Sequence, residues 1–401
     1  MGSNSYKSMG HRSSVDRRTF MKIGGVIGGG LLLGNPSLWA ADNGKNDPPM
    51  TNINEALKMD RIANSVPGFK PGKVVEVVDE NAMHDKVVDT KTVAAMLEKG
   101  LTHLTGLSMK KSFKALFKKS DVIGIKVNPV GPHIISTHLE IVDALIAFLE
   151  KNGVPRGNII IWDRFDYMLT DAGFTAERFP GVGIEGLQTM DEPAAEGLTD
   201  DNSKWLDDSG THISLSNFDQ SAYYWADVKG PDDTAYLNQH VVNGRYSFFG
   251  KLLTQKLTKI INVPVFKNTG NGISMATKNL GYGSICNTGR LHNPLFFNVC
   301  TEVIAFPYIR NKLVLNVTDA LIGQYDGGPS GDAKFTYEKK SLFFATDPFA
   351  LDMICHQQMV EKRKTMNVRV NEHPRFTDYL RYAETLGLGI ADSEKIEYEL
   401  V

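Results

Sequence analysis

Three consecutive segments decide the fold of this chain: Ser120–Val127 (SDVIGIKV), Thr137–Lys151 (THLEIVDALIAFLEK) and Asn158–Trp162 (NIIIW). The first and third are short apolar runs rich in β-branched residues, which is typical of buried strands. The middle segment places apolar residues at helical spacing along its length. Thr137 and Glu140 have the form of a capping box at its start. The order strand–helix–strand predicts a βαβ unit whose two strands are parallel neighbours.

The same alternation extends over most of the chain. Further strands are predicted at 73–78, 259–265, 312–317 and 341–345, and further helices at 249–258, after Asp347 and from about 375 to 386. Asp347 and Pro348 suit the N-cap and the first position of a helix. Residues 180–246 differ, because an acidic stretch is followed by aromatic runs that indicate short antiparallel strands. We therefore expect an α/β domain over 73–401 with a mixed, mainly parallel sheet, flanking helices and a smaller, mostly antiparallel insertion at about 180–246.

The first forty residues have the form of an export signal. A basic segment with the pair Arg17-Arg18 precedes an apolar, glycine-rich run at 23–33, and small residues follow at 40–41. The run is too short for a membrane span of roughly twenty residues. The twin arginine resembles the signal used to export folded proteins. We expect a signal peptide at 1–40, a linker at 41–72, the twin-arginine machinery as a partner and a periplasmic protein with no stable membrane span after cleavage. An uncleaved signal that acts as a membrane anchor stays open.

Composition excludes several classes of protein. The formal net charge of −2 argues against nucleic-acid binding, which usually requires a basic surface. The three cysteines, Cys286, Cys300 and Cys355, form no CxxC or CxxCH motif. This chain alone therefore supplies neither a c-type haem nor a four-cysteine iron–sulfur cluster. One disulfide with one free thiol, or three buried thiols, would both fit the cysteines.

Polar side chains gather where the predicted strands end. Ligands of open α/β sheets bind beyond the carboxyl ends of the strands, and a glycine-rich loop at 270–283 lets backbone approach an anion. We predict that these strand ends and this loop form one polar pocket. Its candidate residues are Lys126, Asn128, Asp163, Lys267, Lys278, Asn279, His292 and Asp319.

Two chemistries could use these residues. The lysines 126, 267 and 278, with Asn128 and Asn279, could hold an anionic cofactor or substrate. Asp163, His292 and Asp319 are the candidates for acid–base catalysis or for binding a metal ion. Asp352 is a further polar residue that could point at the site. The sequence leaves open an enzyme of unknown reaction and a non-catalytic accessory or binding protein, such as an electron-transfer or maturation partner.

From Ser120 onward the chain resembles the bacterial and archaeal family called domain of unknown function 362. The stretches that carry the resemblance are Ile125–Asn128, Ile261–Lys267, Thr277–Gly281, Val317–Leu321, Gly327–Pro329, Ala345–Asp352 and Ala383–Gly389. The resemblance implies an α/β fold and the site positions above, but no reaction. Relatives tend to have a histidine after the first-motif lysine, where this chain has Asn268. Some relatives carry a ferredoxin-type domain, which we do not find here.

Overall fold

The computed structural model describes residues 49–188, 204–206, 212–214, 217–228, 245–292 and 295–401. The predicted signal peptide at 1–40 lies outside these residues. Within them, no helix has the length and apolar character needed to cross a membrane. Cys286, Cys300 and Cys355 are buried and none of the three forms a disulfide, which is one of the two arrangements that the sequence left open.

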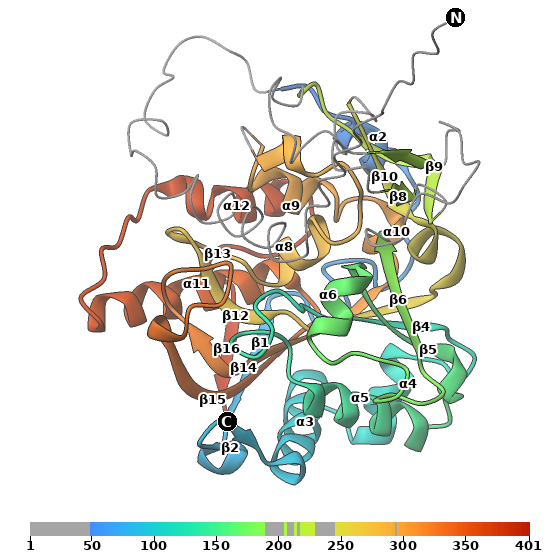
Figure 1. Cartoon of the computed structure of the whole chain (residues 1–401). Helices are drawn as coiled ribbons and strands as arrows, with labels where there is room; N and C mark the ends of the chain where they lie inside the picture. Colours follow the sequence, from blue (N-terminus) through green and yellow to red (C-terminus); the bar gives the residue numbers. More distant parts are fainter. Residues whose placement is uncertain (1–48, 189–203, 207–211, 215–216, 229–244, 293–294) are drawn as a thin grey trace, which may run out of the picture.

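A ten-stranded mixed sheet forms the centre of the molecule (Figure 1). Its strands are Lys73–Val78 (β1), Ile123–Lys126 (β4), Ile159–Phe165 (β5), Gly183–Gln188 (β6), Lys259–Asn262 (β11), Val265–Thr269 (β12), Gly272–Ile273 (β13), Leu313–Gln324 (β14), Thr336–Ala345 (β15) and Glu397–Leu400 (β16). Their order is β16-β1-β15-β14-β11-β4-β5-β6, and β12 pairs with β13 and β14. The neighbours from β14 through β11, β4 and β5 to β6 are parallel, whereas β15 is antiparallel to β14 and β1. The predicted mainly parallel α/β fold is confirmed.

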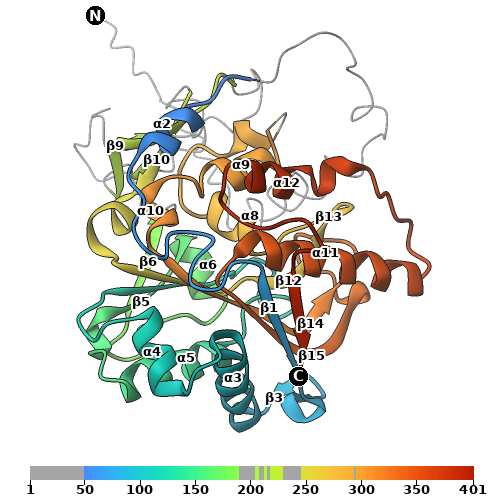
Figure 2. The same ribbon diagram turned by 180° about the vertical axis from the view of Figure 1, so that it is seen from behind.

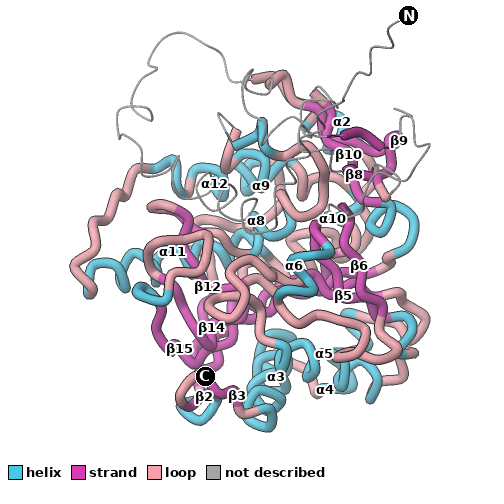
Figure 3. The backbone as a smooth tube through the Cα atoms, viewed as in Figure 1, coloured by secondary structure: helices cyan, strands magenta, loops and turns pink. Residues whose placement is uncertain are grey.

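Helices cover both faces of this sheet, as Figures 2 and 3 show. The helices α3 (Thr90–Thr105), α4 (Met109–Leu116) and α5 (Leu139–Lys151) lie on one face. The helices α8 (Ala276–Gly281) and α11 (Pro348–Thr365) contact the other face, with α9 (Asn298–Glu302) and α12 (Asp378–Thr385) packed on them. Strands buried on both faces explain why the sequence segments are continuously apolar rather than alternating.

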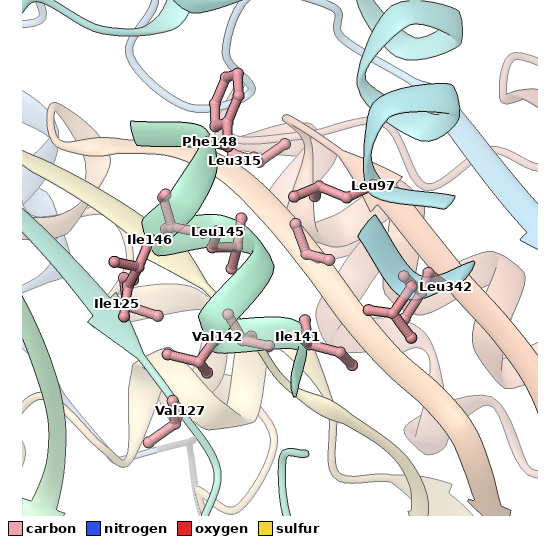
Figure 4. Close-up of a cluster of buried hydrophobic side chains, with 14 of the residues drawn as sticks. Leu97, Ile125, Val127, Ile141, Val142, Leu145, Ile146, Phe148, Leu315 and Leu342 are labelled. Carbon is pink, nitrogen blue, oxygen red and sulfur yellow. The ribbon is translucent and has the colours of Figure 1, made fainter. Parts of the chain in front are cut away.

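The predicted βαβ unit is present, with β4 parallel to β5 and α5 between them in sequence. Figure 4 shows the apolar side of α5, where Ile146 and Val142 lie beside Ile125 and Val127 of the β4 segment. The ring of Phe148 packs edge-on against Phe113 of α4, with 6.0 Å between the ring centres. These side chains are buried together. The spacing that indicated a helix is therefore the spacing that fills this core.

The start of α5 differs from the predicted capping box. His138, not Thr137, is the N-cap residue, and no side-chain cap bond is made. The Thr137 hydroxyl donates to the carbonyl of Val263 at 2.9 Å and accepts from the Asn128 N–H at 2.9 Å. The backbone N–H of His138 instead donates to the carboxylate of Asp319 at 2.7 Å. A carboxylate from a distant strand, and not Glu140 of the predicted capping box, thus accepts the N–H of the N-cap residue.

The strands β14 and β15 are longer than predicted, and β11 ends earlier than predicted. Asp319 consequently lies inside β14 rather than at a strand end. The predicted strand 259–265 is broken after Asn262, and Lys267 belongs to a separate strand, β12. The Asp347 cap is confirmed: its carboxylate accepts the N–H groups of Phe349 and Ala350 at the start of α11.

Residues 49–72, expected to be part of a linker, contribute to the fold. The helix α2 (Ile53–Lys58) buries Ile53 and Ala56, and Thr51 forms a β-bridge with Ala226. The expected antiparallel strands at 180–246 are present: β9 (Phe218–Trp225) pairs with β10 (Tyr246–Gly250), and β7 (Lys204–Leu206) with β8 (His212–Ser214). However, β6 joins the main sheet, and the helix expected at 249–258 is a π-helix at Leu252–Lys256 that follows β10. Shorter elements are β2 (Met83–His84), β3 (Val87–Val88), α6 (Asp166–Asp171) and α10 (Pro307–Arg310).

Candidate functional site

Lysine, asparagine and aspartate side chains meet at the carboxyl ends of β4 and β5. Lys126 is the last residue of β4, and Asp163 lies in the second half of β5. Lys267 comes from β12, and Lys278 and Asn279 come from the short helix α8. This is the end of a parallel sheet where ligands of α/β proteins bind. We call Lys126, Asn128, Asp163, Lys267, Lys278 and Asn279 the lysine cluster.

Lys126 is paired with a carboxylate although its side chain is buried. Its ammonium group donates to Asp163, to the Asn279 side-chain oxygen at 2.9 Å and to the carbonyl of Val127 at 2.7 Å. Burial lowers the pKa of Lys126, and the attraction of Asp163 counteracts part of that effect. The charges of Lys126 and Asp163 therefore largely balance each other.

Lys267 has no such balance. Its side chain is 0% exposed, and its ammonium group donates to the side-chain oxygen of Asn128 at 2.9 Å and to the carbonyl of Val130 at 2.8 Å, both neutral groups. Burial, and after it the positive charge of Lys278, lowers the pKa of Lys267 to about 7, although Asp163 acts in the opposite direction. Lys267 is thus a buried amine that changes its charge near neutral pH.

Lys278 and His292 lie among aromatic rings at the more accessible side of the cluster, where both are half-buried. The Lys278 ammonium lies 5.2 Å from the ring centre of Phe296 and 5.7 Å from that of Tyr282. The His292 ring lies 4.6 Å from the Tyr282 ring. Burial lowers the pKa of Lys278 to about 8. Burial, followed by repulsion from Lys278, lowers the pKa of His292 to about 4, so this imidazole is neutral at neutral pH.

A fourth cation, Arg164, was not among the eight predicted site residues. It follows Asp163 in β5, is buried, and donates to the hydroxyl of Thr288. Nδ1 of His292 donates to the carbonyl of the same Thr288 at 3.0 Å, and the charge of Arg164 contributes to the low pKa of His292. The only signal in the sequence was its position next to Asp163 at the end of a predicted strand.

A chain of buried amides orients Asn279. Its side-chain nitrogen donates to the oxygen of Asn262 at 2.8 Å, and the nitrogen of Asn262 donates to the oxygen of Asn316 at 2.9 Å. The nitrogen of Asn279 is thereby occupied, and its oxygen faces Lys126. Asn262 and Asn316 lie in apolar strands and were missed, because such strands offer no local sign that a polar residue supports a site.

Asp352 supports the cluster from behind rather than pointing into it. Its carboxylate accepts the backbone N–H groups of Ala276 and Thr277 at 2.9 Å each, and so holds the first turn of α8. Burial raises the pKa of Asp352 to about 6, and these hydrogen bonds limit the increase.

Gly283 packs closely against the cluster: a Cβ atom there would lie 2.5 Å from Cε of Lys126. Asn268, at the position where relatives have histidine, accepts the N–H of Gly328 at 3.0 Å and so holds the glycine turn.

Asp319 is placed elsewhere. Its carboxylate accepts from the backbone N–H of His138 and lies 2.8 Å from Nδ1 of the same residue. Of the eight predicted site residues, six form the lysine cluster, His292 adjoins it through Lys278 and Tyr282, and Asp319 belongs to a different group. In the part of the chain that the structure describes, no group of three or more His, Cys, Asp or Glu residues could hold a metal ion.

The fold and this site describe an α/β protein with a cation-rich cluster at the carboxyl end of its parallel strands. Residues 244–357 match the model of a family described as Domain of unknown function (DUF362). The match includes Lys267, Lys278, Asn279 and Asp319, and it confirms the family resemblance. No curated protein and no solved structure matches the chain.

Proposed function

We propose that this protein binds a small anionic molecule, bearing a phosphate or a carboxylate, at the lysine cluster. The observation that carries the proposal is Lys267, a fully buried ammonium whose hydrogen-bond partners, Asn128 and Val130, are neutral. A buried charge without a counter-ion is costly, so such groups either lose their proton or acquire a partner of opposite charge. An anion beside Lys267 and Lys278 would be that partner.

The balance of charge favours an anion over a metal ion. Lys126, Lys267, Lys278 and Arg164 bring positive charge, and Asp163, the carboxylate in the cluster, is already paired with Lys126. A cation would be repelled by the remaining ammonium groups, whereas an oxyanion would gain charge-assisted hydrogen bonds. The ligand would enter at Lys278, which is half-buried, and would lie beside the rings of Tyr282 and Phe296.

An enzymatic role for the same site is the second candidate, and a specific observation favours it. Lys267 and His292 both have strongly lowered pKa values, of about 7 and about 4, and both adjoin Lys278. Perturbed titratable groups that lie close together are typical of active sites. In such an enzyme, the neutral form of Lys267 would accept a proton and Lys278 would bind the anionic group of the substrate.

The alternative of an accessory protein calls for an exposed apolar surface, for which the aromatic strands β9 and β10 are the place to look. Among the described residues of these strands, Tyr246 is 42% exposed, whereas Phe218, Tyr224 and Phe249 are buried. The exposed part is thus a single tyrosine with partly exposed neighbours. The lysine cluster offers the stronger basis for a function.

We also propose that the protein is exported to the periplasm through the twin-arginine pathway. The support is the sequence pattern alone: Arg17-Arg18 before a short apolar run. Loss of residues 1–40 would remove five basic residues and one acidic residue, and so would change the formal charge from −2 to −6. Proteins exported in the folded state often acquire a bound molecule before transport, which is compatible with an occupied lysine cluster.

The test is calorimetric titration of the purified protein with inorganic phosphate and, separately, with acetate and oxalate. Mass spectrometry of molecules released on denaturation would identify a ligand that co-purifies. We expect Lys278→Met to weaken binding of the responding anion about tenfold or more, because a charge-assisted hydrogen bond is worth about 1.5–3 kcal/mol.

The matched control is Lys312→Met. Lys312 is half-buried, donates to the carbonyl of Leu253, and directly precedes β14, at the end of the sheet opposite the cluster. This variant should bind the anion as the unaltered protein does. Equal binding by the Lys278→Met variant, or no binding of any of the three anions and no released ligand, would refute the proposed function.

A further inference from the structure

A second polar site lies at the start of α5, on residues that the lysine cluster does not use. A pocket of about 260 Å³ is present there. Its lining includes Lys86, Thr137, His138, Glu140 and Thr336, and none of the six lysine-cluster residues. Asp319, which the sequence grouped with the lysines, lies directly behind this lining through its bonds to His138.

The His138 ring is held in a defined orientation. Nδ1 lies 2.8 Å from Oδ2 of Asp319, which also accepts the backbone N–H of His138 at 2.7 Å. The other oxygen of Asp319 accepts the N–H of Leu321 at 3.1 Å, so the carboxylate cannot turn freely. Asp319 is 0% exposed, whereas the His138 side chain is 19% exposed. Because Nδ1 faces a carboxylate, it carries a proton, and within the described residues Nε2 has no hydrogen-bond partner.

Helix capping does not account for this arrangement. The Asp319 carboxylate caps α5 through the backbone N–H of His138, and any residue at position 138 would supply that N–H. The imidazole adds a pair between a half-buried histidine and a buried carboxylate at a pocket. A carboxylate behind a histidine is the device by which proteins orient the imidazole ring and stabilise its protonated form.

We propose that His138, oriented by Asp319, anchors a second small-molecule site, which binds a small carboxylate or phosphate through Nε2–H. Lys86, in the turn between β2 and β3, supplies a second positive charge at the pocket. The pocket is smaller than usual ligand sites of roughly 300–1,000 Å³, which restricts the ligand to a few non-hydrogen atoms.

The charge state of His138 agrees with this role. Burial lowers its pKa, but the attraction of Asp319 and a smaller contribution from Glu140 outweigh burial, so the pKa is raised. The titratable groups that face it are Asp319 from β14, Glu140 from α5, Lys86 from the β2–β3 turn and the exposed His133 from the preceding loop. A protonated His138 donates from Nε2, and binding should therefore weaken as the pH rises through its pKa.

The experiment is a titration followed by NMR of the histidine Cε1–H signals in the intact protein, with acetate in one arm and inorganic phosphate in the other. A built-in reference is His103, whose Nδ1 lies 2.7 Å from Glu399 on the surface, where both side chains are about a third or more exposed. We expect a saturable shift of the His138 signal and a higher His138 pKa in at least one arm, with the His103 signal unchanged. A response to acetate alone identifies a carboxylate ligand, and a response to phosphate alone identifies a phosphate ligand.

Variants complete the test. His138→Asn keeps a good N-cap residue and should weaken binding of the responding anion about tenfold or more, whereas His103→Asn should not change it. Lys86→Met, an exposed substitution that cannot disturb the core, should also weaken binding. Lys278→Met should leave the His138 shift intact, which separates this site from the lysine cluster. If His138 and His103 respond alike to both anions, or if His138→Asn and Lys86→Met bind as the unaltered protein does, the second site does not exist.

Discussion

Replacement of Lys267 by Met removes a buried amine and keeps nearly the same side-chain length. In the folded protein without ligand, burial and the charge of Lys278 hold the pKa of Lys267 at about 7, compared with an ordinary value of 10.5. In the unfolded chain this pKa returns to its ordinary value. Between these two values the unfolded state binds more protons, so the free energy of unfolding rises with pH. At pH 7 the cost of holding a charged Lys267 in the interior therefore lowers the free energy of unfolding, and this cost disappears as the pH rises.

The size of this effect follows from the difference between the two pKa values. One pH unit corresponds to about 1.4 kcal/mol, so the full difference corresponds to about 5 kcal/mol between pH 7 and pH 10.5. Met does not titrate, so the unfolding free energy of the variant should lack the pH dependence that Lys267 contributes. From pH 7 to pH 9, the unaltered protein should gain roughly 2–3 kcal/mol of unfolding free energy relative to Lys267→Met.

The assay is urea unfolding of both proteins across this pH range, with Lys256→Met, a surface substitution at a lysine paired with Glu185, as the control. Saturating anion should flatten the pH dependence of the unaltered protein, because a bound anion keeps Lys267 protonated. Anion affinity should fall as the pH rises above 7. Parallel curves of unfolding free energy against pH for the unaltered protein and Lys267→Met would refute the assignment of Lys267 as a buried titrating amine.

Two further predictions concern the packing of the lysine cluster and export. Gly283→Ala should destabilise the protein by about 1–3 kcal/mol and weaken anion binding, because the new Cβ atom would lie 2.3 Å from the backbone carbonyl oxygen of Asn279. Urea unfolding and calorimetry measure the two effects. The control is Gly157→Ala, whose new Cβ atom would have no atom within 4 Å. Joint replacement of Arg17 and Arg18 by Lys should leave the protein in the cytoplasm, as fractionation and immunoblotting would show, and arrival of the double variant in the periplasm would exclude the twin-arginine assignment.

The lysine cluster was predictable from the sequence to the extent that it follows from strand ends. Lys126 ends β4 and Asp163 lies near the end of its parallel neighbour β5, so their meeting follows from the βαβ pattern once the strands are recognised. Lys278 and Asn279 were found because glycines flank them in the sequence, but the predicted loop at 270–283 is wrong in form: the two residues lie in the helix α8, after the short strand β13. Arg164 and the buried amides Asn262 and Asn316 were not found, because their roles depend on neighbours that are distant in the chain.

By itself the sequence determined the parallel strands β4 and β5, the helix between them and the Asp347 cap of α11. These depend on periodicity and on contacts among residues a few positions apart, which a linear reading contains. Only the tertiary structure decided that Asp319 pairs with His138 rather than with the lysines, and that Asp352 holds α8. The order and the length of the strands determine which residues Asp319 and Asp352 contact. Strand order and strand length in turn result from packing across the whole sheet. A side chain that lies inside a strand instead of at its end therefore meets a different set of neighbours.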